Sequence, residues 1–229
     1  MSERDALRAM LAQLAVVLGE ELRRRVVIIG GTAPALYAGP DRAGLRATKD
    51  VDVVVEAATY PTWRRAVAQL EDRGFAYRAG DPVCRYRHNA LTVDVLPSEP
   101  AAIGLRESRW FSQVHASRQH SEAVDLDVVD PLILLGLKIE ALDDRATGLI
   151  GGDKDLEDIV VVLANVDGVI DAIREGRAPI HAFLRERLRG LVEGEAGRER
   201  IESYLPGDDA TQRFAADLHG RLARGISST

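Results

Sequence analysis

The chain contains very little cysteine, and this limits the kinds of site that it can form. Cys84 is the only cysteine among 229 residues, which excludes an internal disulfide and a cysteine-based zinc cluster. No apolar run approaches the roughly 18 residues that a membrane-spanning helix needs, and the charged N-terminal residues do not resemble a signal peptide. The histidines show no metal-ligand spacing. We therefore expect a cytoplasmic protein that does not bind a membrane.

Lysine is also scarce. The 30 basic residues include only three lysines, Lys49, Lys138 and Lys154, and the remainder are arginines. Such a chain can keep lysine where a compact, flexible ammonium group is needed. The net charge of −6 does not indicate a nucleic-acid-binding protein overall, although a local basic patch can still bind phosphate. Length and a 46% hydrophobic content are typical of one large globular domain, or of one domain with an appendage.

The stretch from Val26 to Val55 indicates a function more strongly than any other. Its first four residues, Val26–Ile29, are wholly apolar, which predicts a short strand buried on both faces. Gly30 and Gly31 predict a turn into a short helix, followed by a loop over residues 39–48. The backbone N–H groups of such a turn can bind a phosphate.

The next predicted strand, Asp50–Val55, carries two acids at alternate positions. Side chains two residues apart on a strand share a face, so Asp50 and Asp52 lie side by side while the intervening valines face the core. Neighbouring carboxylates repel each other unless a cation lies between them, and oxygen ligands suit Mg²⁺. An ordinary strand with a solvent-exposed polar face would show the same alternation.

A third acid, Asp94, lies at the centre of a hydrophobic strand predicted over residues 90–96. This strand is expected to pair with a strand over 83–87 across a turn at His88-Asn89. Three acids are the number that a two-metal phosphoryl-transfer site requires. We therefore expect Asp50 and Asp52 to bind both metal ions, and Asp94 to bind the metal ion on the nucleophile side and to serve as a candidate base.

The remaining pattern predicts an α/β (α+β) protein with a mixed sheet and flanking helices. Helices are expected over 3–24 and 62–73, from Pro131 to about residue 144, and from about residue 153. Strands are expected over 75–78 and 124–128, whereas residues 98–121 fit no element clearly. We expect a core of residues 1–128 and a helical region of residues 129–229 that completes the active-site cleft.

Two motifs resemble those of known nucleotidyltransferases. The Gly-Gly-Thr of residues 30–32 and the Asp-x-Asp of residues 50–52 resemble motif I of the polymerase β-like nucleotidyltransferases. Lys138, Arg145 and the Lys-Asp-Leu-Glu-Asp of residues 154–158 resemble the AbiEii-type nucleotidyltransferase toxins, including the MenT group. The resemblance covers residues 26–164. Many relatives have Gly-Ser at the turn, where this chain has Gly-Gly with Thr32 following.

The resemblance implies transfer of a nucleotide from a nucleoside triphosphate, with Mg²⁺ or Mn²⁺, to an acceptor hydroxyl. It implies that the acceptor is tRNA and that the protein is the toxin of a bacterial toxin–antitoxin or phage-defence pair, with a cognate antitoxin as partner. The implied catalytic residues are Asp50, Asp52, Asp94, Lys138 and Asp155. The implied nucleotide-binding residues are Gly30, Gly31, Thr32, Arg46, Lys138 and Lys154.

Other interpretations remain open from the sequence. Lys138, Lys154 and the acids near them could form surface ion pairs one helical turn apart, which contribute little. Arg85 and Arg87 could bind an acceptor or could be ordinary outward-facing strand residues. The acceptor could be a small molecule such as an aminoglycoside, or a protein hydroxyl. The chain could also be a nucleotide- or partner-binding module without catalytic activity.

Overall fold

The computed structural model describes residues 3–37, 48, 50–106, 108–146, 152–192, 199, 203 and 217–224. These residues fall into two compact units. The first comprises the described residues of Met1–Leu36 and Arg46–Ile133, and the second those of Tyr37–Leu45 and Leu134–Thr229. The first unit contains the sheet, and the described part of the second is helical.

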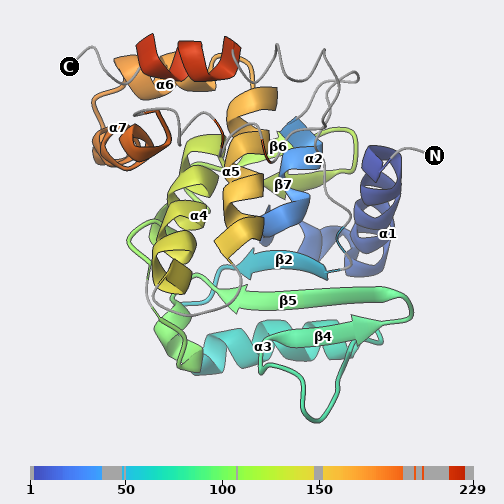
Figure 1. Cartoon of the computed structure of the whole chain (residues 1–229). Coiled ribbons are helices and arrows are strands. Elements are labelled where there is room, and N and C mark those ends of the chain that lie inside the picture. The colour runs from blue at the N-terminus through green and yellow to red at the C-terminus, as the bar shows by residue number, and fades with distance from the viewer. Residues whose placement is uncertain are drawn as a thin grey trace. The chain divides into compact units, whose positions relative to one another are not determined.

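The sheet of the first unit has seven strands in the order β3-β4-β5-β2-β1-β7-β6, and β4, β5 and β2 lie side by side (Figure 1). The β2–β5 and β1–β7 pairs are parallel, whereas the other neighbouring pairs are antiparallel. This confirms the predicted mixed α/β class. The strands are β1 (Val26–Ile29), β2 (Asp50–Val55), β3 (Ala76–Tyr77), β4 (Arg85–His88), β5 (Leu91–Pro97), β6 (Gln119–Ser121) and β7 (Leu126–Val128).

Several strands match their predicted positions, and the differences have local causes. The strands predicted over 26–29 and 50–55 are found at those residues. The strand predicted over 124–128 begins at Leu126, because Asp125 adopts a left-handed conformation with φ of 55°. Residues 98–121, which the sequence left unassigned, contain β6, an edge strand paired with β7, and two short 3₁₀ turns, Pro100–Ile103 and Phe111–Gln113.

Helix α1 (Glu3–Arg23) is interrupted, which corrects the prediction of one continuous helix. Gly19 has φ of 65° and ψ of 175°, outside helical values. Glycine tolerates this conformation because it lacks a Cβ, and a Cβ at this position would collide with the guanidinium of Arg73. The glycine therefore allows the helix to bend where it meets the segment that follows helix α3 (Tyr60–Glu71).

Helix α3 is fixed to the sheet by a buried tryptophan. A capping box starts the helix: the Thr59 hydroxyl accepts from the backbone N–H of Thr62, and the Thr62 hydroxyl accepts from that of Thr59. One turn later, Trp63 is 1% exposed and its Nε1 donates to the carbonyl oxygen of Val95 at 3.0 Å. This bond joins α3 to the strand that carries Asp94.

Among the described residues, the second unit consists of helices. They include most of α4 (Pro131–Ala146), then α5 (Gly152–Asn165), α6 (Val169–Glu175) and α7 (Pro179–Val192). Arg185 of α7 donates to the carbonyl oxygens of Ile173 and Gly176 at 2.6 and 3.0 Å, and so satisfies acceptors at the end of α6. No helix in the described part of the chain is long and apolar enough to cross a membrane.

We predict that Trp63→Phe lowers the free energy of unfolding by about 1–2 kcal/mol, because the Val95 carbonyl loses a buried donor while the apolar volume is largely kept. Urea unfolding followed by circular dichroism would measure the change. Tyr60→Phe is the matched control, since Tyr60 is an exposed aromatic residue of the same helix. Equal effects of the two substitutions would contradict the prediction.

Candidate functional site

The three predicted carboxylates lie on neighbouring parallel strands. Strands β2 and β5 pair so that Asp52 is directly opposite Asp94, and Asp50 is opposite Thr92. Directly opposite residues of a ladder share a face, and Asp50 shares that face with Asp52. The structure therefore brings together the acids that the sequence singled out from segments about 40 residues apart.

Arg85 of β4 binds two of these acids. It lies opposite Asp94 in the antiparallel β4–β5 pair, and its guanidinium donates from Nε to Oδ1 at 2.8 Å and from Nη2 to Oδ2 at 2.7 Å. The same Nη2 donates to Oδ2 of Asp50 at 3.1 Å. The hydrogen bonds to Asp94 raise the pKa of Arg85 above its usual value, so the guanidinium stays charged.

This contact was missed from the sequence, because the predicted turn at His88-Asn89 pairs Arg87 with Ala90 and so places Arg85 opposite Thr92. The turn lies one residue later, at Asn89-Ala90, which sets His88 opposite Leu91 and Arg85 opposite Asp94. Arg87, two residues along β4, instead binds both carboxylate oxygens of Asp81 at 2.9 and 3.1 Å. Arg85 is thus not a simple outward-facing residue, because two candidate acids hold it.

Gly30 allows its backbone to approach Asp52 closely. Its φ is 70°, and a Cβ at this position would collide with Oδ2 of Asp52 and lie 2.8 Å from Cγ. Gly30 begins a 3₁₀ turn, Gly30–Thr32, that leads into α2 (Pro34–Tyr37), as the Gly-Gly turn predicted. Thr32 is fully buried, and its hydroxyl donates to the Ile29 carbonyl at 3.5 Å. The threonine hydroxyl therefore bonds to the chain's own backbone.

The oxygen ligands of these three acids suit a divalent cation. The contact of Arg85 with two of them shows that a positive charge is accommodated there. Three carboxylates on one face offer the oxygen ligands that Mg²⁺ and Mn²⁺ accept, and the Arg85 guanidinium already bridges two of them as a cation. In the described part of the chain, no three histidine, cysteine, aspartate or glutamate side chains already converge as metal ligands. Arg85 contacts both carboxylate oxygens of Asp94 and one of Asp50.

A second charged cluster joins two helices of the second unit. The Nζ of Lys138 on α4 lies 3.2 Å from Oδ1 of Asp155 and 2.6 Å from Oδ2 of Asp158, both on α5. The two aspartates are 3–4% exposed and the lysine 14%. These buried pairs between helices contradict the interpretation of Lys138 as part of a surface i,i+4 ion pair.

The protonation of Lys138 reflects two opposing effects. Burial alone lowers the pKa of an ammonium group, but the carboxylates of Asp158 and Asp155 outweigh it and raise the pKa of Lys138 above 10.5. The lysine therefore stays charged at neutral pH. Lys138 therefore supplies one positive charge to both buried carboxylates.

The other predicted site residues differ in exposure, and some lie outside the described residues. Lys154 is exposed on α5, whereas Asp155 beside it is buried. Arg46 and Lys49 lie outside the described residues, as does Arg42 of the predicted phosphate-binding loop. Cys84 is buried, and burial raises the pKa of its thiol to about 11, which disfavours a nucleophilic thiolate.

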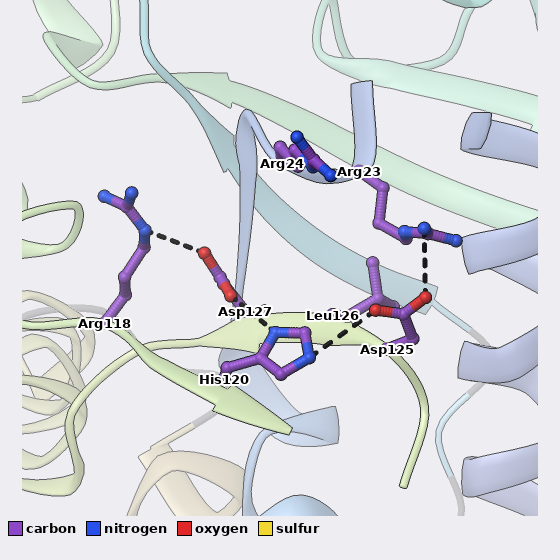
Figure 2. Close-up of a pocket in the computed structure, with 7 residues that line it drawn as sticks. All are labelled: Arg23, Arg24, Arg118, His120, Asp125, Leu126 and Asp127. Atoms are coloured by element: carbon purple, nitrogen blue, oxygen red, sulfur yellow. Dashed lines mark hydrogen bonds and ion pairs between the residues drawn. The ribbon is translucent and has the colours of Figure 1, made fainter. Parts of the chain in front are cut away.

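A separate pocket of about 420 Å³ lies between the end of α1 and strands β6 and β7. Figure 2 shows that its charged side chains form a chain of pairs. His120 contacts Asp127 at 3.0 Å on one side and Asp125 at 3.5 Å on the other, and these acids bind Arg118 and Arg23. None of the residues predicted to be functional lines this pocket.

Comparison with known proteins supports the fold. No protein-family model and no curated protein sequence matches the chain. The structure resembles the crystal structure of an antigenic nucleotidyltransferase-like protein from Paracoccidioides brasiliensis, with a TM-score of 0.50 and 16% sequence identity over 91% of this chain and 97% of that chain. At this identity the likeness establishes a nucleotidyltransferase-like fold. The narrower resemblance to the AbiEii-type toxins remains a prediction.

We predict that Gly30→Ala displaces the Asp52 carboxylate and lowers the free energy of unfolding by more than backbone strain alone. A non-glycine residue at positive φ costs about 1–2 kcal/mol, and the collision with Asp52 adds to this. Gly104→Ala is the control, because Gly104 has φ of 74° with nothing within 4 Å of a Cβ. Urea unfolding compares the two, and an equal loss would contradict the close contact.

We predict that Lys138→Met lowers the free energy of unfolding by about 3–5 kcal/mol at pH 7, because the substitution removes an ammonium group that contacts two buried carboxylates. In the unchanged protein the folded-state pKa of Lys138 is raised, so its contribution is complete below pH 10.5 and disappears as the pH rises through the folded-state pKa.

Urea unfolding followed by far-ultraviolet circular dichroism, repeated over a range of pH, would measure both effects. Lys154→Met is the matched control, since Lys154 is exposed on α5, and we expect a change within about 0.5 kcal/mol. Similar losses for the two methionine variants would show that the Lys138 pairs do not stabilise the fold.

Proposed function

We propose that the protein is a metal-dependent nucleotidyltransferase that moves a nucleotide from a nucleoside triphosphate to an acceptor hydroxyl. The observation that supports this most is the in-register pairing of Asp52 with Asp94 on parallel strands, with Asp50 on the same face and Gly30 against Asp52. A phosphoryl-transfer site of this kind needs several carboxylates on a rigid element. The nucleotidyltransferase-like fold is consistent with the proposal.

In this proposal Asp50, Asp52 and Asp94 hold Mg²⁺ or Mn²⁺. The cation supplies charge that neutralises the triphosphate and polarises its α-phosphate. Asp94 is proposed to accept the proton of the acceptor hydroxyl, since it faces Asp52 across the ladder. The backbone N–H groups of Gly30 and Gly31 are proposed to bind phosphate oxygens.

The nucleotide-binding roles of the remaining residues rest on the motif resemblance. We propose that Lys138, Lys154 and Arg46 bind the triphosphate, with Thr32 supporting the turn and Asp155 acting with Lys138. Because Lys138 pairs with two buried aspartates, binding a phosphate there would require it to exchange a partner. Of these residues, Lys154 has the most accessible ammonium among those described, because it is exposed on α5.

We further propose tRNA as the acceptor and a toxin role in a bacterial toxin–antitoxin or phage-defence pair, with a cognate antitoxin, in the cytoplasm. This rests on the resemblance of residues 138–158 to the AbiEii-type toxins. A basic small molecule, such as an aminoglycoside, is the second candidate acceptor. The net charge of −6 favours it, because an acidic protein attracts a cationic substrate.

Label transfer tests the proposal. The purified protein is incubated with Mg²⁺ and each α-labelled nucleoside triphosphate, together with bacterial tRNA, protein extract or aminoglycosides. We expect labelled tRNA, and we expect Asp52→Asn to reduce the labelling at least 100-fold because the acid that faces Asp94 is lost. Asp81→Asn is the control: Asp81 pairs with Arg87 and lies outside the proposed site.

The outcomes separate the candidate functions. Label on an aminoglycoside or on protein would keep the reaction and change the acceptor. Nucleotide binding without transfer to any acceptor would favour a binding module that lacks catalytic activity. Equal labelling by the Asp52→Asn and Asp81→Asn variants would show that the three acids are not the site.

A further inference from the structure

We propose that Arg85 is an internal cation that competes with the divalent metal ion for Asp50 and Asp94, and so gates the candidate site. In this view the metal ion binds only when the guanidinium leaves the two carboxylates. The inference rests on the proposed function, because it takes the three acids as the metal ligands. It assigns a regulatory role to a residue that the motif resemblance does not include.

The contacts of Arg85 place its charge where a metal ion would bind. The guanidinium donates from Nε and Nη2 to the two oxygens of Asp94, a two-point contact called the fork here. The distances of 2.8 and 2.7 Å are within the range of charge-assisted hydrogen bonds. Its third contact reaches Asp50 at 3.1 Å. Since Asp50 and Asp94 lie on different strands, the guanidinium bridges the β2–β5 pair and fixes the direction of both carboxylates.

Charge repulsion makes it unfavourable for Arg85 and a divalent ion to contact Asp50 and Asp94 at the same time. A divalent ion that contacted Asp50 and Asp94 would lie within a few ångströms of the guanidinium, and like charges at that separation repel strongly where water is partly excluded. Asp94 is 14% exposed and Asp50 is 42% exposed, so water screens the contact less at Asp94 than at Asp50. The guanidinium and the metal ion therefore exclude each other at these oxygens.

The position of Arg85 also gives it a route away from the acids. Its side chain is partly exposed, and the Asp50 side chain beside it is 42% exposed. An arginine side chain can swing from such a site by rotating its own dihedral angles, without a change in the strand that carries it. Exchange of one cation for another thus requires no rearrangement of the sheet.

Arg87 provides a matched control for this proposal. It lies on the same strand and also forms a two-point contact with an aspartate, but that aspartate is Asp81. Replacing Arg87 removes one positive charge and one two-point contact with a carboxylate from β4. It does not free a candidate metal ligand. A general effect of charge on cation binding would appear in both variants, whereas a gate would appear only at Arg85.

The test is Mn²⁺ binding, measured by the loss of the free-ion electron paramagnetic resonance signal. Site binding is defined as the part that Asp52→Asn abolishes. We expect Arg85→Gln to bind Mn²⁺ at least 10-fold more tightly than the unchanged protein and than Arg87→Gln. Arg85→Lys, which keeps a charge but cannot form the fork, is expected to bind with intermediate affinity and covers the case in which Arg85→Gln does not fold.

Thermal melting gives a second measurement that does not depend on activity. With a chelator present, Arg85→Gln should melt at a lower temperature than the unchanged protein, because three carboxylates then face one another without the guanidinium. Added Mn²⁺ should raise its melting temperature by more than that of the unchanged protein or of Arg87→Gln, because binding to the folded state stabilises it.

Two results would overturn the gate in distinguishable ways. If the unchanged protein shows Mn²⁺ binding that depends on Asp52, and no Arg85 variant binds more tightly, the gate is wrong while the proposed metal site stands. If neither the unchanged protein nor any Arg85 variant shows such binding, the metal site and the proposed function fail together.

Discussion

The parallel register of β2 and β5 is the constraint on which the candidate site depends. It sets Asp52 opposite Asp94 and places Asp50 beside them, so three like charges share one face of the sheet. Such an arrangement is unfavourable unless a cation is close to it. Arg85 supplies one from the next strand, and the absence of a side chain at Gly30 leaves space for the Asp52 carboxylate.

The opposite face of the same strands holds that register in place. Val51 and Val53 on β2 pair with Val93 and Val95 on β5, and all four are at most 1% exposed. A slip of one residue would turn these valines toward the polar face and bury the carboxylates in the core. The cost of burying several charges makes the alternative register far less stable, so the hydrophobic core determines the geometry of the acids.

Local sequence patterns predicted the strands and the positions of the acids. They did not predict which side chains from distant segments contact each other. Alternation identified Asp50, Asp52 and Asp94, because side-chain direction on a strand depends only on its own sequence. The bend at Gly19 lies against Arg73, 54 residues later in the sequence, and could not be inferred from helical periodicity. The burial of Lys138 with Asp155 and Asp158 depends on how α4 and α5 pack, which spacing along one helix does not define.

The location of the two tryptophans has a practical consequence for studying the molecule. Trp63 and Trp110 are 1% and 3% exposed, and both belong to the first unit, while the second unit has none. Selectively excited tryptophan fluorescence therefore reports the loosening of the sheet unit alone. Far-ultraviolet circular dichroism also records helices α5 to α7 of the second unit. A difference between the two signals during denaturation would reveal whether the two units melt together or one after the other.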